Sequence, residues 1–232
     1  MDTSNIKVIA FDADDTLWDC QTHFEAVEQQ YCSLLSNFGD TSHISTSLFA
    51  TEQANMAELG YGCKAFTLSL IENAVKVSQG DVDANTLLQI EMLGRSLHAI
   101  PSTPLDGVEE TLRAIRDTRR FGMLVFTKGE ILDQESKLRR SGLWDYFDRV
   151  MVVADKTRAK YRELCQTMGI DISQLLMVGN SFKSDIEPVL RLGGYAVHIP
   201  FEVTWAHEKT EEFDHDNLAR ITHFKQLMEI LK

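Results

Sequence analysis

Short apolar runs alternate with longer amphipathic stretches along most of this chain. Five runs rich in Val, Ile, Leu and Phe have the length and composition of buried strands, and they lie at 7–11, 121–127, 149–154, 175–180 and 195–200. Stretches with helical periodicity lie at 106–119, 130–141, 157–168 and 184–192, and a last amphipathic helix is expected at 221–231. Strands that alternate with helices of this length predict right-handed βαβ units and an α/β fold with a doubly wound, Rossmann-like parallel sheet.

The interval between the first and second runs has a different pattern. Residues 20–100 contain no strand-like run, and their apolar residues recur at helical spacing. Breaks near Gly39, Gly60 and Gly80 divide this interval into four helices. We therefore predict a core made of residues 1–19 and 101–232, with an α-helical cap domain inserted at 20–100. The insertion leaves the core just after the first strand, so it is expected to act as a lid over the end of that strand.

Polar side chains follow four of the five strand-like runs. In chain order they are Asp12 with Asp14, then Thr127, then Lys156, and finally Asn180 with Asp185. Because ligands bind just outside the carboxyl ends of strands in open parallel sheets, we expect these residues to meet at one edge. Asp12 and Asp14 would repel one another there unless a cation or a proton intervenes, which suggests a divalent metal.

This set of residue types supports one kind of chemistry in particular. A carboxylate attacks phosphorus when a metal offsets the repulsion between anions, and a second carboxylic acid can protonate the leaving oxygen and later deprotonate a water molecule. A hydroxyl and a lysine can bind the phosphoryl oxygens, where charge concentrates in the transition state. Carboxylate and carbonyl oxygens are suitable ligands for Mg²⁺.

Composition and charge narrow the partners. The chain has 232 residues, 44% of them hydrophobic and 25% charged, as in an ordinary globular protein. Its formal net charge of -12 would repel a nucleic acid polymer, whereas a small phosphorylated metabolite could still bind through a local lysine and a metal. No apolar stretch reaches the length of a membrane span, and the N-terminal residues are not those of a signal peptide.

The cysteines agree with a reducing compartment. Four of them are widely scattered, without a C-x-x-C pair, and they are expected to be free thiols rather than a disulfide framework or a zinc site. The default expectation is a cytoplasmic protein without a membrane partner, and its oligomeric state is open.

The ordered motifs resemble those of the haloacid dehalogenase superfamily, in its phosphatase branch with an inserted helical cap. The segment FDADDTLW at 11–18 is similar to the first motif of that family, D-x-D-x-T. Thr127 in VFTKG is similar to the second motif, Lys156 to the third, and GNSFKSD at 179–185 to the fourth, G-D-x-x-x-x-D. Order and spacing agree from residue 6 to about 200.

The resemblance implies a role for each matching residue. Asp12 would be the nucleophile that forms an aspartyl-phosphate, and Asp14 would be the general acid and base. Thr127 and Lys156 would bind the phosphoryl group. The implied metal ligands for the Mg²⁺ cofactor are Asp12, the backbone carbonyl of Asp14, Asp185 and Asn180. The cap would select the substrate.

Two positions depart from a simple match. Asn180 stands where most members of the family have a metal-binding Asp; its amide oxygen can ligate Mg²⁺ but carries no charge, so Asp15 or Asp185 is expected to compensate. The segment DKTRAK lacks the proline that often follows the motif lysine, so Lys160 competes with Lys156 for that role. Lys156 is nearer the strand end and is favoured.

The resulting function hypothesis is Mg²⁺-dependent hydrolysis of a small phosphomonoester. The resemblance implies that members cleaving carbon–halogen bonds lack the second Asp, which favours phosphate chemistry here. A phosphomutase of the same superfamily, a phospho-accepting receiver-like protein and a non-catalytic ligand-binding relative are the alternatives. Asp15 is expected to be a turn residue, His198 a packed or surface histidine, and residues 203–215 a polar surface loop.

Overall fold

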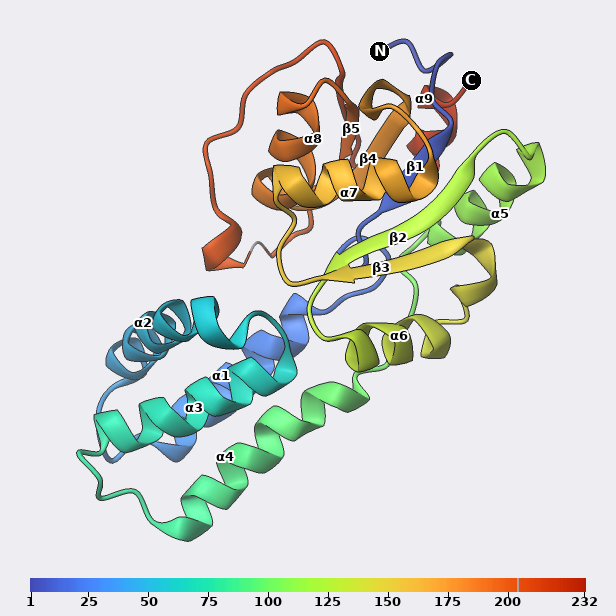
Figure 1. Ribbon diagram of the computed structural model, residues 1–232. Coiled ribbons are helices and arrows are strands. Elements are labelled where there is room, and N and C mark those ends of the chain that lie inside the picture. The colour runs from blue at the N-terminus through green and yellow to red at the C-terminus, as the bar shows by residue number, and fades with distance from the viewer. Residues whose placement is uncertain (204) are drawn as a thin grey trace. The chain divides into compact units, whose positions relative to one another are not determined.

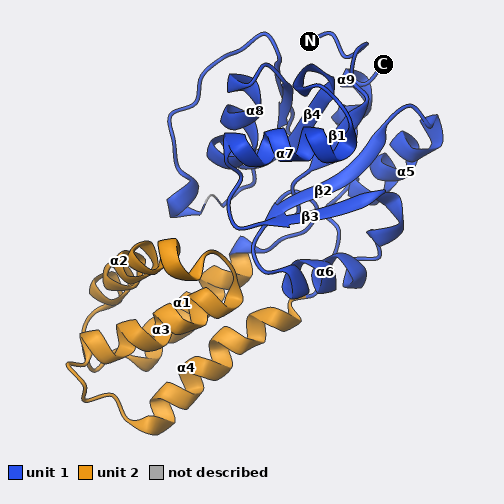
Figure 2. Cartoon of the chain, viewed as in Figure 1, with its two compact units in different colours: residues 1–21, 101–232 blue, residues 22–100 orange. Residues whose placement is uncertain are grey.

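The computed structural model describes residues 1–203 and 205–232. The chain divides into two compact units (Figure 2): a core unit formed by Met1–Gln21 with Pro101–Lys232, and a helical unit formed by Thr22–Ile100. Within the described residues, none of the helices combines the length and the apolar character that a membrane span needs.

A parallel six-stranded sheet forms the centre of the core unit (Figure 1). Its strands lie in the order β3-β2-β1-β4-β5-β6, and all neighbours pair in parallel. Their bounds are β1 Val8–Phe11, β2 Gly122–Lys128, β3 Arg149–Val153, β4 Leu175–Gly179, β5 Tyr195–His198 and β6 Leu218–Arg220. The order reverses direction beside β1, between β2 and β4, where open α/β sheets bind their ligands. The predicted α/β fold with a parallel sheet is confirmed.

Both faces of the sheet are covered by helices, so its inner strands are apolar on both sides. Along β1, Ile9 and Phe11 pack into one hydrophobic cluster, whereas Val8 and Ala10 pack into the other. The first cluster includes residues of α5 (Val108–Thr118), α6 (Ile131–Arg140) and α9 (Leu227–Ile230). The second includes residues of α7 (Arg158–Met168) and α8 (Glu187–Arg191). This two-sided burial explains why β1 reads as a continuous apolar run.

The C-terminal part of the core differs from its prediction in two ways. Strand β6, which pairs with β5, was not predicted, because a run of three residues is too short to show a period. The amphipathic helix expected at 221–231 is reduced to a 3₁₀ turn at Phe224–Gln226 followed by the short helix α9. Phe224, Leu227 and Leu231 are nevertheless buried against the sheet, so the apolar pattern marks packing rather than helix length.

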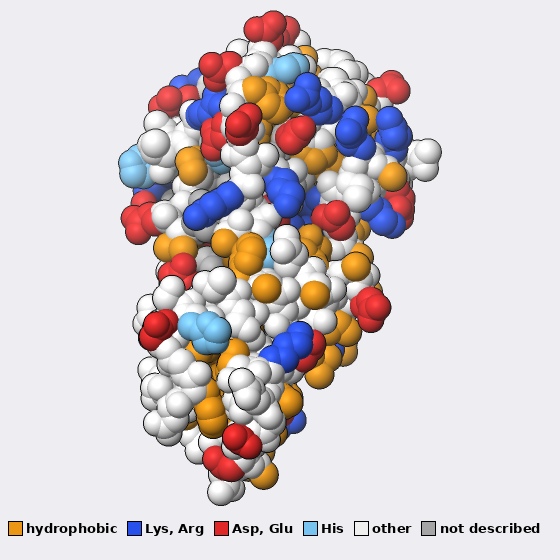
Figure 3. Space-filling model, turned by 90° about the vertical axis from the view of Figure 1, so that its left-hand side faces the viewer, with side chains coloured by type: hydrophobic (Ala, Val, Ile, Leu, Met, Phe, Trp, Pro, Cys, Tyr) orange, Lys and Arg blue, Asp and Glu red, His pale blue; other side chains and the backbone are white. Residues whose placement is uncertain are grey.

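The helical unit contains α1 (Gln21–Leu34, its first residue belonging to the core unit), α2 (Thr41–Leu59), α3 (Cys63–Val77) and α4 (Ala84–Ser96). Side-chain caps start two of them: Asp40 accepts from the His43 N–H at 2.8 Å, and Asp83 accepts from the Asn85 N–H at 2.8 Å. On the face drawn in Figure 3, charged side chains are dense on the core unit, whereas hydrophobic and uncharged ones predominate on the helical unit.

Candidate active site

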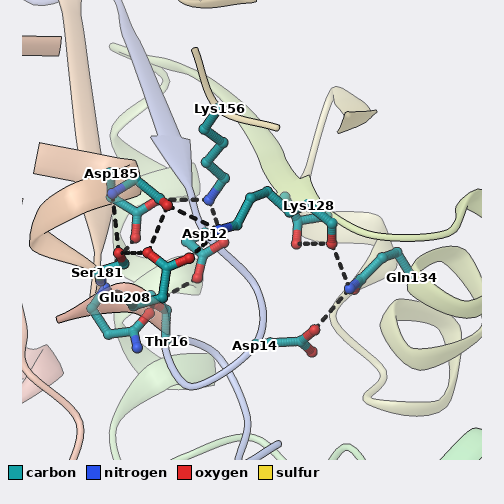
Figure 4. Close-up of polar contacts among 12 residues, drawn as sticks. Asp12, Asp14, Thr16, Lys128, Gln134, Lys156, Ser181, Asp185 and Glu208 are labelled. Carbon is teal, nitrogen blue, oxygen red and sulfur yellow. Dashed lines mark hydrogen bonds and ion pairs between the residues drawn. The ribbon is translucent and has the colours of Figure 1, made fainter. Parts of the chain in front are cut away.

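Asp12 is the first residue beyond β1, and its side chain is almost completely buried. The backbone fixes its position, because the Asp12 N–H donates to the Val178 carbonyl of β4 at 2.9 Å. The Lys156 ammonium group lies between two carboxylates: it forms a short ion pair with Asp12 Oδ1 and a 2.6 Å ion pair with Asp185 Oδ1 (Figure 4). Three residues from three strand ends therefore meet at the carboxyl edge of the sheet.

The electrostatics of this cluster show an excess of negative charge. Burial raises the pKa of Asp12 to about 7, against the opposing effect of Lys156 and with a further contribution from Asp185. Burial also raises the pKa of Asp185, although Lys156 acts in the opposite direction. The pKa of Lys156 itself is raised despite burial, because Asp12 and Asp185 favour its charged form. Two carboxylates thus share one ammonium group, and a bound cation would neutralise the remaining negative charge.

Asp185 is placed by the turn that follows β4. A short π-helical turn spans Phe182–Ile186, and the Ser181 N–H donates to Asp185 Oδ2 at 3.0 Å. A Cβ atom added at Gly179 would lie only 2.2 Å from Asp185 Oδ2, so glycine is required where this carboxylate packs against the strand end. The Tyr161 hydroxyl donates to the Asp185 carbonyl at 3.1 Å and fixes the turn from the side of α7. A π-helical turn of this kind often marks a functional site.

Asn180 reaches Asp12 through Thr16. The Thr16 hydroxyl lies 3.2 Å from Asp12 Oδ2 and 3.1 Å from Asn180 Oδ1, and it accepts from the Asn180 N–H at 3.1 Å. Because a hydroxyl has a single proton, it cannot satisfy both oxygens fully. His198 of β5 is buried, with Nε2 3.0 Å from the Asn180 carbonyl oxygen, so it packs against this turn. An uncharged amide oxygen therefore lies beside the carboxylates.

Thr127 and Lys128 end strand β2 at the same edge. Thr127 is buried, and its hydroxyl lies 3.3 Å from the Lys128 carbonyl oxygen. Gly129 follows with φ of 125°, a conformation that side chains other than glycine rarely adopt. The chain thus turns sharply after Lys128, leaving both side chains at the strand end.

Asp14 has its own set of partners, separate from the Lys156 cluster (Figure 4). Its carboxylate accepts from Trp18 Nε1 at 2.8 Å, from Gln134 Nε2 at 2.7 Å and from Lys137 Nζ at 2.7 Å. Burial opposes ionisation of Asp14, but Lys137 and these hydrogen bonds outweigh it and lower the pKa. Asp12 and Asp14, two residues apart, are therefore in opposite electrostatic environments.

The sequence profile of the haloacid dehalogenase-like hydrolases matches residues 6–193. The chain belongs to this family. A haloacid dehalogenase-like hydrolase from Xanthomonas campestris has the same fold with a TM-score of 0.88 and 29% identity, over 100% of this chain and 94% of that one.

Two other relatives carry different activities in their names. YjjG of Escherichia coli (strain K12), a pyrimidine 5′-nucleotidase, is 37% identical over 90 residues, which is 36% of this chain and 39% of the nucleotidase. The 2-haloacid dehalogenase of Pseudomonas syringae pv. Tomato DC3000 shares the fold with a TM-score of 0.63 and 20% identity, over 97% and 98% of the two chains. The similarity to the dehalogenase concerns the fold alone.

Two other candidate residues, Lys160 as the alternative lysine and Asp15 as a compensating carboxylate, make contacts outside the Lys156 cluster. Lys160 is on the exposed side of α7 and pairs with Glu163 at 2.7 Å. Asp15 adopts a left-handed conformation with φ of 60°, and its carboxylate accepts from the N–H groups of Cys20 and Gln21 at 2.8 Å each. Burial raises the pKa of Asp15 to about 7, against these hydrogen bonds. Its contacts are those of a turn residue that caps the start of α1.

Sequence reasoning missed three side chains that contact the site. Gln134 and Lys137 come from α6, where a spacing of three residues places them on one face of the helix and next to Asp14. That spacing was visible in the sequence, but its partner was not. Glu208, in the segment expected to be a polar surface loop, forms an ion pair with Lys128 and hydrogen bonds with Ser181 and Ser184 (Figure 4). No periodicity or motif indicated it.

Proposed function

We propose that this hydrolase cleaves a small phosphomonoester, with Mg²⁺ as cofactor and with an aspartyl-phosphate on Asp12 as the intermediate. One observation carries the proposal: the Asp12 carboxylate lies with Lys156 and Asp185 at the strand edge, while Asp14 stands two residues away in a separate hydrogen-bonded environment. A nucleophile and a proton carrier with different environments are what a two-step displacement requires.

In the first step, a carboxylate oxygen of Asp12 attacks phosphorus, the ester P–O bond breaks, and Asp14 gives a proton to the leaving oxygen. Asp14 must carry that proton beforehand, which requires that its contact with Lys137 be weakened, because Lys137 favours the ionised form. In the second step, the Asp14 carboxylate takes a proton from water, the water oxygen attacks phosphorus, and Asp12 is released with inorganic phosphate. Lys156 and the Thr127 hydroxyl bind the phosphoryl oxygens.

The donor set fits Mg²⁺, since it consists of oxygen atoms and carries excess negative charge. Asp12, Asp185, Asn180 and the backbone carbonyl of Asp14 would hold the ion. When bound, Mg²⁺ supplies positive charge that reduces the repulsion between the carboxylates and the phosphoryl oxygens. Asp12 and Asp185 share Lys156 as a counter-ion, and this imbalance of charge supports the assignment.

For the substrate, we propose the monophosphate of a small metabolite, with pyrimidine nucleoside monophosphates as the first class to test. The name of the Escherichia coli relative supports that class, although the match spans less than half of either chain. Carbon–halogen cleavage is the rival chemistry, since a dehalogenase shares the fold. Asp14 argues against carbon–halogen cleavage. When Asp12 attacks a haloacid, the leaving group is a halide rather than an oxygen that needs a proton, so the reaction has no use for a general acid.

The test is release of phosphate from a panel of nucleoside monophosphates, sugar phosphates and a chromogenic aryl phosphate, with Mg²⁺ or with EDTA. We expect phosphate release that requires Mg²⁺ and that Asp12→Asn abolishes. Activity that persists in Asp12→Asn or in EDTA contradicts the mechanism. Interconversion of phosphate isomers without free phosphate would instead identify a mutase, and chloride release from 2-chloropropionate would identify a dehalogenase.

A further inference from the structure

Glu208 reaches the site from the connection between β5 and β6. A 3₁₀ turn at Ala206–Glu208 carries it, and its own N–H donates to the Trp205 carbonyl at 2.9 Å. Lys183, from the turn that contains Asp185, donates to the His207 carbonyl at 2.8 Å. The backbone at Glu208 and at the preceding residue is thus held by its own turn and by the turn after β4.

Three donors converge on the Glu208 carboxylate. Lys128 forms a short ion pair with Oε1, the Ser181 hydroxyl forms a short hydrogen bond with Oε2, and the Ser184 hydroxyl donates to Oε2 at 2.6 Å. Lys128 also donates to the Ser184 hydroxyl at 2.9 Å, so the network is closed. The side chains of Lys128 and Glu208 are only 14% and 11% exposed, and solvent therefore screens the pair weakly.

Hydrogen bonds link Glu208 to the turn that carries the proposed metal ligands. Ser181 links the two parts, since its hydroxyl contacts Glu208 and its N–H donates to Asp185 Oδ2 at 3.0 Å. Burial opposes ionisation of Glu208, but Lys128 and the serine hydroxyls lower its pKa to about 2. Glu208 thus places a negative charge on Ser181, the residue that follows the uncharged Asn180.

We propose that Glu208 is a charge-setting and positioning residue of the phosphoryl site: its carboxylate neutralises Lys128, ties it to the turn of Asn180 and Asp185, and returns to that turn the negative charge that Asn180 lacks. This inference rests on the proposed function, which makes this edge of the sheet a phosphoryl site. It goes further than that function because it assigns to the site a residue outside the four motifs.

If Glu208 has this role, loss of its charge changes the affinities for the two ligands of the site, a metal cation and a phosphate anion, in opposite directions. Glu208→Gln keeps the size of the side chain and an acceptor oxygen, but removes the negative charge that pairs with Lys128. A cation then binds more weakly and an anion more tightly. A unit charge at several ångströms in a partly buried site shifts each affinity by about tenfold. A purely structural role of Glu208 would weaken both affinities together.

The experiment uses the full chain and two probes that require no turnover. Calorimetry measures Mg²⁺ binding to the free protein, and inorganic phosphate is titrated against the same protein without Mg²⁺. We expect Glu208→Gln to bind Mg²⁺ about tenfold more weakly and phosphate about tenfold more tightly than the wild type. Glu211→Gln, at an exposed glutamate of the same segment, is the matched control and should leave both affinities unchanged.

Two further variants make the outcome specific. Lys128→Met combined with Glu208→Gln restores the charge balance, so both affinities should return toward wild-type values, and Glu208→Asp should rescue them partly. Glu208→Gln overturns the inference if both affinities fall with the melting temperature, or if neither changes. A wild type that binds both probes but hydrolyses no phosphomonoester refutes the proposed function and leaves the inference on Glu208 to be decided by these affinities. If the wild type binds no Mg²⁺, the proposed cofactor is wrong and the phosphate arm alone decides.

Discussion

Replacing Lys156 by methionine tests how the candidate site is held together. Lys156 is the cation shared by Asp12 and Asp185, and its ammonium group is 2.6 Å from Asp185 Oδ1. At an effective dielectric constant of about 20, this contact alone corresponds to roughly 6 kcal/mol of gross attraction. Part of that is recovered when the carboxyl groups take up protons, so we expect Lys156→Met to lower the free energy of unfolding by about 3–5 kcal/mol at pH 7.5.

The sign of the pH dependence follows from the same contacts. Without Lys156, the pKa values of Asp12 and Asp185 rise further above the values of the unfolded chain, near 4. The unfolded state then loses its protons first as the pH rises, so the variant is destabilised progressively above about pH 4. The loss relative to the wild type should therefore be smaller at pH 5 than at pH 8.

Lys160→Met is the matched control, because the Lys160 side chain is 40% exposed and forms an i,i+3 pair with Glu163. Its effect on stability should be within about 0.5 kcal/mol of zero. Urea unfolding at pH 5 and pH 8 measures both variants, and a chromogenic aryl phosphate with Mg²⁺ measures turnover, which we expect Lys156→Met to reduce by roughly 10²–10³-fold. Loss of turnover in Lys160→Met with retention in Lys156→Met would refute the assignment of the lysine.

Three more outcomes follow from the site. Gly179→Ala forces a Cβ to within 2.2 Å of Asp185 Oδ2 and should lower Mg²⁺ affinity by at least about tenfold. Gly122→Ala is the control, because the nearest neighbour of its Cβ would be 3.5 Å away, and it should leave the affinity unchanged. Equal affinities of the two variants in calorimetry would contradict this. Burial raises the pKa of Asp12 to about 7. In EDTA, the free energy of unfolding should therefore fall as the pH rises from about 4 to about 7, and Asp12→Asn should reduce that slope in urea titrations. Mg²⁺ at about 100 times its Kd should stabilise the wild type by about 2.7 kcal/mol and Asp185→Asn by less, as measured by thermal unfolding.

Short apolar runs that alternate with helical stretches predicted the sheet, and therefore the edge at which Asp12, Lys156 and Asp185 meet. The carboxyl ends of parallel strands lie side by side, so residues just beyond them converge without any knowledge of side-chain conformation. Spacing alone left Lys156 and Lys160 as competitors. In the structure, Lys156 pairs with Asp12 and Asp185. Lys160 lies in the first turn of α7, which Thr157 caps, and pairs with Glu163.

The parts that could not be predicted depend on single tertiary contacts. Glu208 belongs to a segment without hydrophobic period, and its partner Lys128 is 80 residues away in the sequence. Lys137 contacts Asp14 across 123 residues. In both cases a long side chain reaches across the strand edge to a group whose position is set by the whole sheet. Local propensity contains no information about such pairs.

The covalent intermediate on Asp12 is the central claim, and one measurement tests it most directly. Asp14→Asn, which lacks the proposed base for the second step, is incubated with a chromogenic aryl phosphate and Mg²⁺, quenched in acid and digested for mass spectrometry. We expect the mass of one phosphoryl group on the peptide that contains Asp12, and we expect it to be absent when Asp12→Asn is added to the variant. A phosphoryl group on another residue, or unlabelled protein with undiminished turnover, would contradict it.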